Sequence, residues 1–353
     1  MQCYPSFRIS RTETMFGGLI LFLMILYLKS TFTPTEVVVP ASKVEFQTVS
    51  LTELLVAAIE AAERGGNMVR KVKEEKKLEV KSKGKTFEGA DDPVTLGDMM
   101  SHKQMYYSLL QMFPDLHIVS EEKSNELPDL KDIKPIDLST KEVEKHLGSS
   151  LNSDARIQDV AVWIDPLDAT KEYTEDLTEY VTTMVCVAHK GEPIIGVIHR
   201  PFLKQTIWAW VGHGRSDVPD YQTSVKDVHT NDMRIIVSRS HAGAVSQIAK
   251  KSFGESAQVI AAGGAGYKAL KVAQRNFHAY IHTTAIKKWD ICAGNALLKT
   301  MGGDMTDLLG RQIDYSYPMH GRSAVKLNKG LLATFKDHKL ILEKLEVEKD
   351  PHD

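Results

Sequence analysis

The sequence predicts an α/β fold in which the first half is rich in antiparallel strands and the second half alternates strands with helices. Two apolar runs, 181–188 and 194–199, flank the segment HKGEP at 189–193, a pattern typical of a β-hairpin. From about Arg234 onward, short apolar runs alternate with helix-length segments, as they do in α/β proteins. A long uncharged run near the N-terminus adds a predicted membrane helix in front of this fold.

The composition is that of an ordinary globular protein. The 353 residues leave room for one large domain or two medium ones, and the formal net charge of −2 gives no reason to expect a nucleic-acid polymer as the main partner. Cys3, Cys186 and Cys292 are too few for a disulfide framework. Because the last two lie in apolar segments, we expect them to be buried thiols rather than a bridge.

The N-terminal run has the properties of a signal anchor. Residues 15–28 read MFGGLILFLMILYL and follow Arg8 and Arg11. Extension to Thr33, with Lys29 snorkelling, approaches the roughly 20 residues that a membrane span needs. The preceding basic residues favour a cytoplasmic tail over 1–14 and a lumenal remainder, which is a single-pass type II topology. A cleaved signal peptide is the alternative, but the following KSTFTPTE lacks a small-x-small cleavage site.

Beyond this anchor at 15–33, we expect a stalk over 34–49, a catalytic α+β half over 50–220, an α/β half over 221–345 and a tail over 346–353. Ser50 and Glu53 match a capping box, and apolar residues at helical spacing then run to Gly65-Gly66. A second helix is predicted over 97–112. The segment 123–159 is rich in charge, Pro and Ser, and is interpreted as a surface excursion that contains at most one short helix.

The predicted elements that follow are mostly short. Further strands are expected at 116–119, 160–164, 206–211, 234–237, 259–260 and 279–281, and a helix at 291–301 that Gly302-Gly303 ends.

Carboxylates recur where these elements begin or end. The stretch VWIDPLDAT at 162–170 places Asp165 and Asp168 directly after a strand, and Glu121 follows another strand. Asp98 and Asp290 each stand near a helix start. An isolated DPxD is more often a solvated turn. Several such acids together, however, are the oxygen ligands that Mg²⁺ prefers, and a paired-ion site needs one carboxylate that bridges both ions.

Three motifs together resemble the lithium-sensitive, magnesium-dependent phosphatase superfamily that includes inositol monophosphatase: SEE at 120–122, WIDPLDAT at 163–170 and WDICAG at 289–294. The resemblance covers about residues 51–345 and implies a layered α-β-α-β-α sandwich. It implies two or three Mg²⁺ ions and inhibition by Li⁺. The metal ligands would be Glu121, Asp165, the Leu167 carbonyl, Asp168 and Asp290. Asp98 and Thr170 would orient and deprotonate the attacking water.

The nucleotide branch of this superfamily, which removes the 3′-phosphate from adenosine 3′,5′-bisphosphate, is the more similar one. Its motifs appear as SRSH at 238–241, GGAGYK at 263–268 and KKWD at 287–290. The resemblance implies a nucleotide substrate bound by Ala169, Ser238, His241, Gly264 and Lys268. Together with the anchor, it implies a Golgi-membrane enzyme whose catalytic domain lies in the lumen and clears the by-product of sulfotransferases.

Other functions stay open at this point. The first alternative is a phosphatase of inositol phosphates or another small phosphate monoester, which would have no use for the nucleotide motifs. A catalytically dead scaffold on the same fold is disfavoured because every expected acid is present. The oligomeric state is not predicted, and a homodimer is one of the alternatives.

Overall fold

The computed structural model describes residues 47–85, 91–123, 133–147, 153–222, 233–239, 242–318 and 325–345. All of them belong to one compact unit, residues 46–353. The predicted cytoplasmic tail, the anchor at 15–33 and most of the stalk lie outside the described residues. Across the described ranges, no helix combines the length and the apolar character that a membrane crossing requires.

Two long helices, α2 (Leu51–Glu74) and α3 (Leu96–Met112), open the fold. The predicted start of α2 is confirmed, since Ser50 Oγ accepts a 3.3 Å hydrogen bond from the Glu53 N–H. The predicted end at Gly65-Gly66 is wrong. A Cβ on Gly65 would lie 2.4 Å from Met105 Sδ, and one on Gly66 would lie 2.3 Å from His199 Cδ2. These glycines therefore allow α2 to pack closely on α3 and on the first sheet, and the helix continues past them.

The first sheet has the strand order β10-β9-β8-β7-β6-β4. Only β4 and β6 run parallel, and the other neighbours are antiparallel. The predicted hairpin between β7 and β8 is confirmed, with Lys190 and Gly191 at φ 52° and 82° in its turn. The strands are β4 (His117–Ser120), β6 (Val160–Asp168), β7 (Thr182–His189), β8 (Glu192–Arg200), β9 (Gln205–Trp210) and β10 (Gly214–Arg215).

The second sheet has the order β12-β11-β13-β17-β15, in which the first three strands are parallel and the others antiparallel. The predicted alternation of strands and helices is confirmed here. Its strands are β11 (Arg234–Ser238), β12 (Gln258–Ala262), β13 (Ala279–His282), β15 (Asp304–Thr306) and β17 (Leu331–Thr334). Its helices are α6 (Ala242–Phe253), α7 (Ala265–Ala273), α8 (Lys288–Thr300) and α9 (His338–Lys344).

Smaller elements complete the described chain. They are the paired strands β1 (Thr48–Ser50) and β5 (Asp154–Arg156), β2 (Lys81–Lys85) and β3 (Asp91–Val94), β14 (Ile286–Lys287) and β16 (Lys326–Leu327), with helices α4 (Lys141–Glu144) and α5 (Thr170–Thr174). Three 3₁₀ turns lie at Ile157–Asp159, Thr178–Tyr180 and Pro201–Leu203. Within the predicted surface excursion, α4 is the one α-helix of the described residues.

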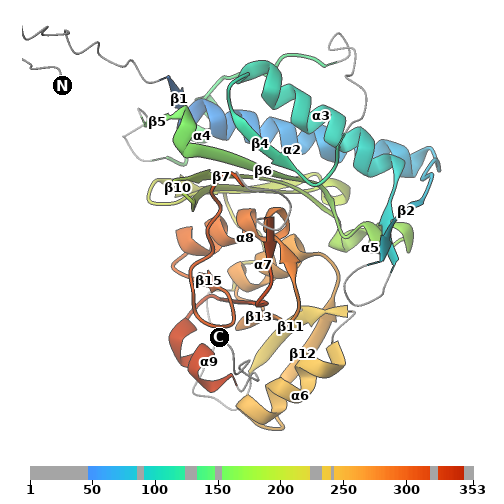
Figure 1. The fold of residues 1–353 in the computed structure, drawn as a ribbon, viewed down its shortest axis with the longest axis vertical. Helices are drawn as coiled ribbons and strands as arrows, with labels where there is room; N and C mark the ends of the chain where they lie inside the picture. Colours follow the sequence, from blue (N-terminus) through green and yellow to red (C-terminus); the bar gives the residue numbers. More distant parts are fainter. Residues whose placement is uncertain are drawn as a thin grey trace, which may run out of the picture. The chain divides into compact units, whose positions relative to one another are not determined.

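The layers alternate between helices and sheets (Figure 1). Helices α2 and α3 cover one face of the first sheet, and apolar side chains of both fill the space between them. Helices α7 and α8 lie between the two sheets and form the largest core with β7, β8, β13 and β17. Helices α6 and α9 pack on the outer face of the second sheet. This is the α-β-α-β-α order that the resemblance implied.

One prediction about the cysteines is wrong. Cys186 in β7 and Cys292 in α8 are joined by a disulfide across 106 residues of sequence, and both side chains are buried. The expectation of two separate thiols failed because the pairing depends on α8 packing on the first sheet, a contact that local sequence does not encode.

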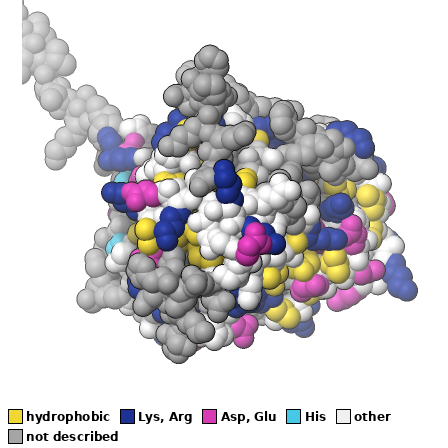
Figure 2. Space-filling model, turned by 90° about the horizontal axis from the view of Figure 1, so that it is seen from below, with side chains coloured by type: hydrophobic (Ala, Val, Ile, Leu, Met, Phe, Trp, Pro, Cys, Tyr) yellow, Lys and Arg dark blue, Asp and Glu magenta, His cyan; other side chains and the backbone are white. Residues whose placement is uncertain are grey.

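Charge is mixed on the face of the molecule shown in Figure 2. There, the described Lys and Arg side chains are interspersed with Asp and Glu side chains. This agrees with the small net charge of the chain, −2.

Candidate active site

Two parallel strands bring the first acids together. In the register of β4 and β6, Ser120 lies opposite Ile164. Glu121 directly follows the end of β4, and in this parallel register it lies beside Asp165, the residue of β6 that follows Ile164. The Glu121 N–H donates a 3.2 Å hydrogen bond to the Ile164 carbonyl and continues this pairing. Asp165 is almost fully buried, at 1% exposure.

The end of β6 is irregular, because its register with β7 shifts between Asp165 and Asp168. Within this segment, Asp165 Oδ1 accepts a 3.1 Å hydrogen bond from the Leu167 N–H. Ala169 adopts the left-handed conformation, with φ 71°. This conformation is costly for a residue with a Cβ and is often found at functional sites. It turns the chain sharply from β6 into α5, so that Thr170 begins the helix.

Asp168 is tied to the glycine-rich loop. Its Oδ1 accepts from the Ala265 N–H at 3.1 Å and its Oδ2 from the Gly266 N–H at 2.8 Å, at the N-terminus of α7. A Cβ on Gly264 would lie 2.7 Å from the Tyr180 carbonyl oxygen and 3.0 Å from Asp168 Oδ2. Gly264 is therefore required for this close approach. The sequence pointed to this loop for the nucleotide and gave no sign that it also holds a predicted metal ligand.

Asp290 enters the same space from the first turn of α8. Its Oδ2 accepts a 3.2 Å hydrogen bond from the Lys287 N–H. Burial raises the pKa of Asp290, and the nearby charges of Glu121 and Asp168 raise it further. Burial also raises the pKa of Asp165, with Glu121, Asp168 and Asp290 adding to the effect. The four predicted carboxylate ligands thus repel one another within one buried region, which a divalent cation would stabilise.

A lysine already interacts with part of this acidic group. Lys83 Nζ, from β2, donates to Glu121 Oε1 at 2.9 Å and also to Glu122 Oε1. Burial alone lowers the pKa of Lys83, but Glu121 and Glu122 outweigh it and hold this pKa above its ordinary value. This side-chain ammonium offsets part of the negative charge of the acidic group. Sequence reasoning missed Lys83, because a lysine in the run KSKGK is usually a solvated surface residue.

The donor set fits Mg²⁺, since it consists of carboxylate and carbonyl oxygens. Within the described ranges, no three His, Cys, Asp or Glu side chains lie close enough together to hold one ion among them. Ligation by the predicted carboxylates would therefore need small side-chain movements, with Lys83 releasing Glu121.

Asp98 and Thr170 form the second part of the site. Thr170 Oγ1 donates to Asp98 Oδ1 at 3.0 Å and also lies 3.1 Å from the Leu167 carbonyl oxygen. Asp98 Oδ2 accepts from the N–H and the hydroxyl of Thr95, which caps α3 and fixes the carboxylate. Burial raises the pKa of Asp98 to about 7, although the Thr95 hydrogen bonds oppose the shift.

The predicted nucleotide-binding residues differ in their positions. Ser238 ends β11, with its hydroxyl 3.4 Å from His282 Nδ1, while His241 lies outside the described residues. Lys268 is only 3% exposed, and its Nζ donates to the carbonyl oxygens of Gly264 and Ala262 at 2.5 and 3.4 Å. Burial lowers the pKa of Lys268 to about 8, although the charge of Asp168 opposes this shift.

A more accessible cation lies nearby. Arg239 Nη1 donates to Glu172 Oε1 at 2.9 Å and to Glu175 Oε2 at 2.7 Å, and 37% of its side chain is exposed. The Glu172 side chain in turn packs against Gly263, where an added Cβ would lie 2.5 Å from Glu172 Cγ. Arg239 was missed because it reads as an ordinary surface residue within SRSH.

The family model described as the inositol monophosphatase family matches residues 50–346. The chain belongs to the inositol monophosphatase family. The family membership expected from the three motifs is therefore confirmed.

Similar proteins carry two kinds of name. The chain is 46% identical to "Inositol monophosphatase 3" of Danio rerio over 86% of this chain and 87% of that protein. It is also 46% identical to "Golgi-resident adenosine 3′,5′-bisphosphate 3′-phosphatase" of Mus musculus, over 86% of this chain and 84% of that protein. A staphylococcal inositol monophosphatase, solved as a complex described as inhibitory after soaking in LiCl, has the same fold. Its TM-score is 0.57 at 20% identity, over 80% of this chain and 90% of that one.

Proposed function

We propose that this chain is a Mg²⁺-dependent phosphatase that removes the 3′-phosphate of adenosine 3′,5′-bisphosphate and leaves AMP. The main observation that supports this chemistry is the position of the Thr170 hydroxyl, which lies within hydrogen-bonding distance of both the Asp98 carboxylate and the Leu167 carbonyl oxygen. This hydroxyl joins a buried carboxylate of raised pKa to the predicted metal ligands. A hydroxyl with an acid behind it can pass a proton from an attacking water to that acid.

The residues that would hold two or three Mg²⁺ ions are Glu121, Asp165, Asp168, Asp290 and the Leu167 carbonyl. When bound, such ions stabilise negative charge on the phosphate and leaving oxygen and supply a water of lowered pKa. Asp165 would be the central ligand, since the charges of Glu121, Asp168 and Asp290 all act on it and raise its pKa. Li⁺ would inhibit, because a monovalent ion at one of these positions supplies less charge.

Recognition of the nucleotide would use the edge of the site formed by the Gly263-Gly264 loop. Both glycines are buried, and the space where a Cβ would stand is filled by Glu172 at Gly263 and by the Tyr180 carbonyl and Asp168 at Gly264. The loop would therefore shape this edge by holding those neighbours close, rather than by offering its own backbone to a base or ribose. Ala169, Ser238 and His241 stay predicted nucleotide contacts.

The 5′-phosphate is not cleaved and needs a cation of its own. The sequence predicted Lys268 for this role, but in the structure its ammonium is buried and bonded to loop carbonyls. Lys268 would then affect substrate binding indirectly, because its hydrogen bond to the Gly264 carbonyl holds the loop in place. Arg239, which is partly exposed and linked through Glu172 to the same loop, is better placed for direct contact with a 5′-phosphate.

The proposed location is the Golgi membrane, with the anchor at 15–33 and the catalytic domain in the lumen. The name of the Mus musculus relative and the uncharged N-terminal run support this proposal. There the enzyme would clear the by-product of lumenal sulfotransferases.

The alternative is a phosphatase of inositol phosphates, which the name of the Danio rerio relative favours. Product analysis separates the two proposals. The full chain is incubated with Mg²⁺ and either adenosine 3′,5′-bisphosphate or inositol 1-phosphate, and the products are separated by chromatography. We expect 5′-AMP from the nucleotide and little free inositol. Release of inositol without attack on the bisphosphate would favour the alternative, and formation of adenosine 3′-phosphate would contradict the proposed site of cleavage.

A further inference from the structure

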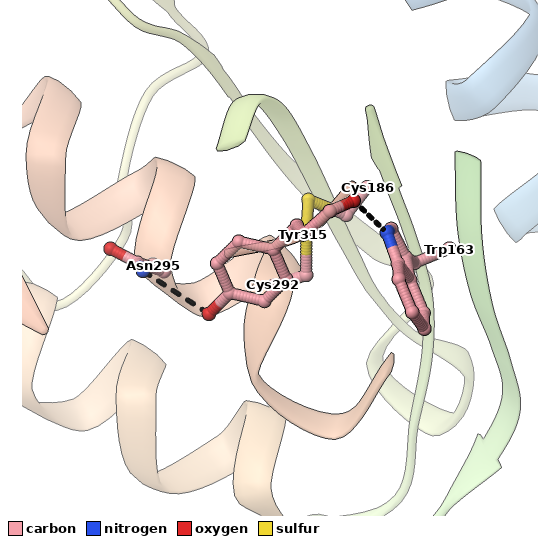
Figure 3. The surroundings of a disulfide bond; sticks show 5 residues. All are labelled: Trp163, Cys186, Cys292, Asn295 and Tyr315. Atoms are coloured by element: carbon pink, nitrogen blue, oxygen red, sulfur yellow. Dashed lines mark hydrogen bonds between the residues drawn. A yellow bond between two sulfur atoms is a disulfide. The ribbon is translucent and has the colours of Figure 1, made fainter. Parts of the chain in front are cut away.

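A disulfide, shown with its surroundings in Figure 3, joins elements that carry two of the predicted metal ligands. Cys292 stands two residues after Asp290 on the first turns of α8. Its partner, Cys186, lies in β7 opposite Trp163 of β6, which is two residues before Asp165. The bond therefore joins the helix that carries one predicted ligand to the strands that carry another (Figure 3).

The surroundings of the bond are close-packed. Trp163 Nε1 donates to the Tyr315 carbonyl oxygen at 2.8 Å, and Asn295 Nδ2 donates to the Tyr315 hydroxyl at 3.1 Å (Figure 3). A Cβ on Gly196 of β8 would lie only 2.3 Å from the Ala293 carbonyl oxygen. Helix α8 thus rests directly on the first sheet, and the disulfide lies within this contact.

This contact has to resist electrostatic repulsion. Asp290 from α8 meets Glu121, Asp165 and Asp168 from the first sheet and its loops, and like charges in a buried region push these elements apart. Packing and a few hydrogen bonds oppose that motion, but a covalent bond opposes it more strongly. Because the bond lies two residues from Asp290, it limits how far the first turn of α8 can move from β6.

We propose that the Cys186–Cys292 disulfide is a positioning element of the metal site: it holds Asp290 against Asp165, so that the protein with reduced cysteines binds Mg²⁺ more weakly. This inference rests on the metal-dependent function proposed above. Reduction by a dithiol transfers two electrons and two protons to the disulfide and yields two thiols, while the dithiol becomes a cyclic disulfide. In an oxidising compartment the bond persists, so the metal site would be best formed there.

The test measures Mg²⁺ binding to the full chain by calorimetry, without substrate. The proteins compared are the wild type, the double variant Cys186→Ala/Cys292→Ala, and wild type produced and kept under dithiothreitol, which retains every side-chain atom. Tyr315→Phe is the matched control, because it removes a hydrogen bond from the same core and leaves the disulfide intact. Circular dichroism confirms folding, and intact mass under denaturing conditions reports the state of the cysteines.

We expect the Mg²⁺ dissociation constant to rise about tenfold in the double variant and in the reduced wild type, as it does when supporting groups of metal ligands are removed. Tyr315→Phe should bind Mg²⁺ as the wild type does, because it leaves the disulfide intact. In steady-state assays the half-saturating Mg²⁺ concentration should rise while the substrate KM at saturating Mg²⁺ does not.

Folded proteins without the bond that bind Mg²⁺ as the wild type does would overturn the inference, even if their melting temperatures fall. Free thiols at both Cys186 and Cys292 in protein made in an oxidising compartment would also overturn it. If the double variant does not fold, the reduced wild type alone is compared with the oxidised wild type, and equal Mg²⁺ binding by the two would overturn the inference. Failure of the oxidised wild type to bind Mg²⁺ at all would instead contradict the proposed function.

Discussion

The Thr170 hydroxyl donates a 3.0 Å hydrogen bond to Asp98 Oδ1, although the two residues lie 72 positions apart in the sequence. Asp98 belongs to the first turn of α3 and Thr170 to the first turn of α5, so two helix starts meet beside the predicted metal ligands. Since burial raises the pKa of Asp98 to about 7, this carboxyl can accept a proton near neutral pH. The pair therefore has the geometry of a general base with a hydroxyl relay.

Thr170→Ala should lower kcat about a hundredfold or more while Mg²⁺ affinity changes little, since it removes the relay and keeps every predicted ligand. Steady-state kinetics and calorimetric Mg²⁺ titration measure the two effects separately. Thr174→Ala is the matched control, because Thr174 lies on the same helix and bonds only to the Lys171 carbonyl in the described structure. An equal loss of Mg²⁺ affinity would favour the alternative in which Thr170 merely fixes the turn through Leu167.

Asp165→Asn should lower activity by about a hundredfold or more, on the order of 3 kcal/mol of transition-state stabilisation. The metal-free variant should also melt at a higher temperature than the wild type, because it replaces a buried charge that three other carboxylates repel. Activity assays and calorimetric melting without metal check both statements. The control is Asp176→Asn, whose side chain is 85% exposed. A folded Asp165→Asn protein that keeps most of its phosphatase rate would remove Asp165 from the ligand set.

The contribution of the buried carboxyls to the stability of the metal-free protein should fall as pH rises from about 4 to about 7. Burial lowers the pKa values of His102 and His199 to about 4, and these two groups act in the opposite direction. Asp98 has a pKa of about 7 in the fold, and the pKa values of Asp165, Asp168 and Asp290 are also raised by burial. A carboxyl with a raised pKa binds its proton in the folded state but not in the unfolded state over this window, so its contribution to stability is lost as pH increases.

Mg²⁺ should reverse this trend, because ligation requires the deprotonated carboxylates and compensates their charge. The increase in melting temperature on adding Mg²⁺ should thus be larger at about pH 7.5 than at about pH 5. Thermal melts at both pH values, with and without Mg²⁺, measure it, and the Asp165→Asn variant is the control. A larger increase at the lower pH would show that these carboxylates do not bind the metal.

Arg239 and Lys268 should respond differently to the choice of substrate. Arg239→Met should lower kcat/KM for adenosine 3′,5′-bisphosphate by about tenfold to a hundredfold. The reason is that the loss of a charge-assisted hydrogen bond costs about 1.5–3 kcal/mol of transition-state stabilisation. It should change kcat/KM for 3′-AMP much less, because that nucleotide lacks the 5′-phosphate. Lys268→Met should affect both substrates alike, since its ammonium binds the carbonyls of the loop.

The comparison between substrates serves as its own control, because any damage to the fold lowers both rates. If Lys268→Met is selective for the bisphosphate and Arg239→Met is not, the original prediction from sequence, that Lys268 binds the 5′-phosphate, is correct.

The sequence predicts those parts of the site that lie in short motifs. WIDPLDAT, SEE and WDICAG each stand at the end or start of an element, and their joint resemblance to one family implies that they meet in one site. The sequence does not predict contacts that depend on packing. Gly65-Gly66 looks like a helix stop until Met105 and His199 are seen against it. Lys83 reaches Glu121 from a hairpin 38 residues away, and no local pattern indicates that.

The central claim is that this metal site acts on a nucleotide rather than on an inositol phosphate. Its most direct test is kcat/KM of the full chain at saturating Mg²⁺ for adenosine 3′,5′-bisphosphate, its 5′-phosphosulfate analogue, inositol 1-phosphate and AMP, with Asp165→Asn as the inactive control. We expect kcat/KM for the bisphosphate to exceed that for inositol 1-phosphate by at least about tenfold, since only the nucleotide can use the 5′-phosphate contact. AMP should not be hydrolysed. A higher kcat/KM for inositol 1-phosphate would show that the site is not built for the nucleotide.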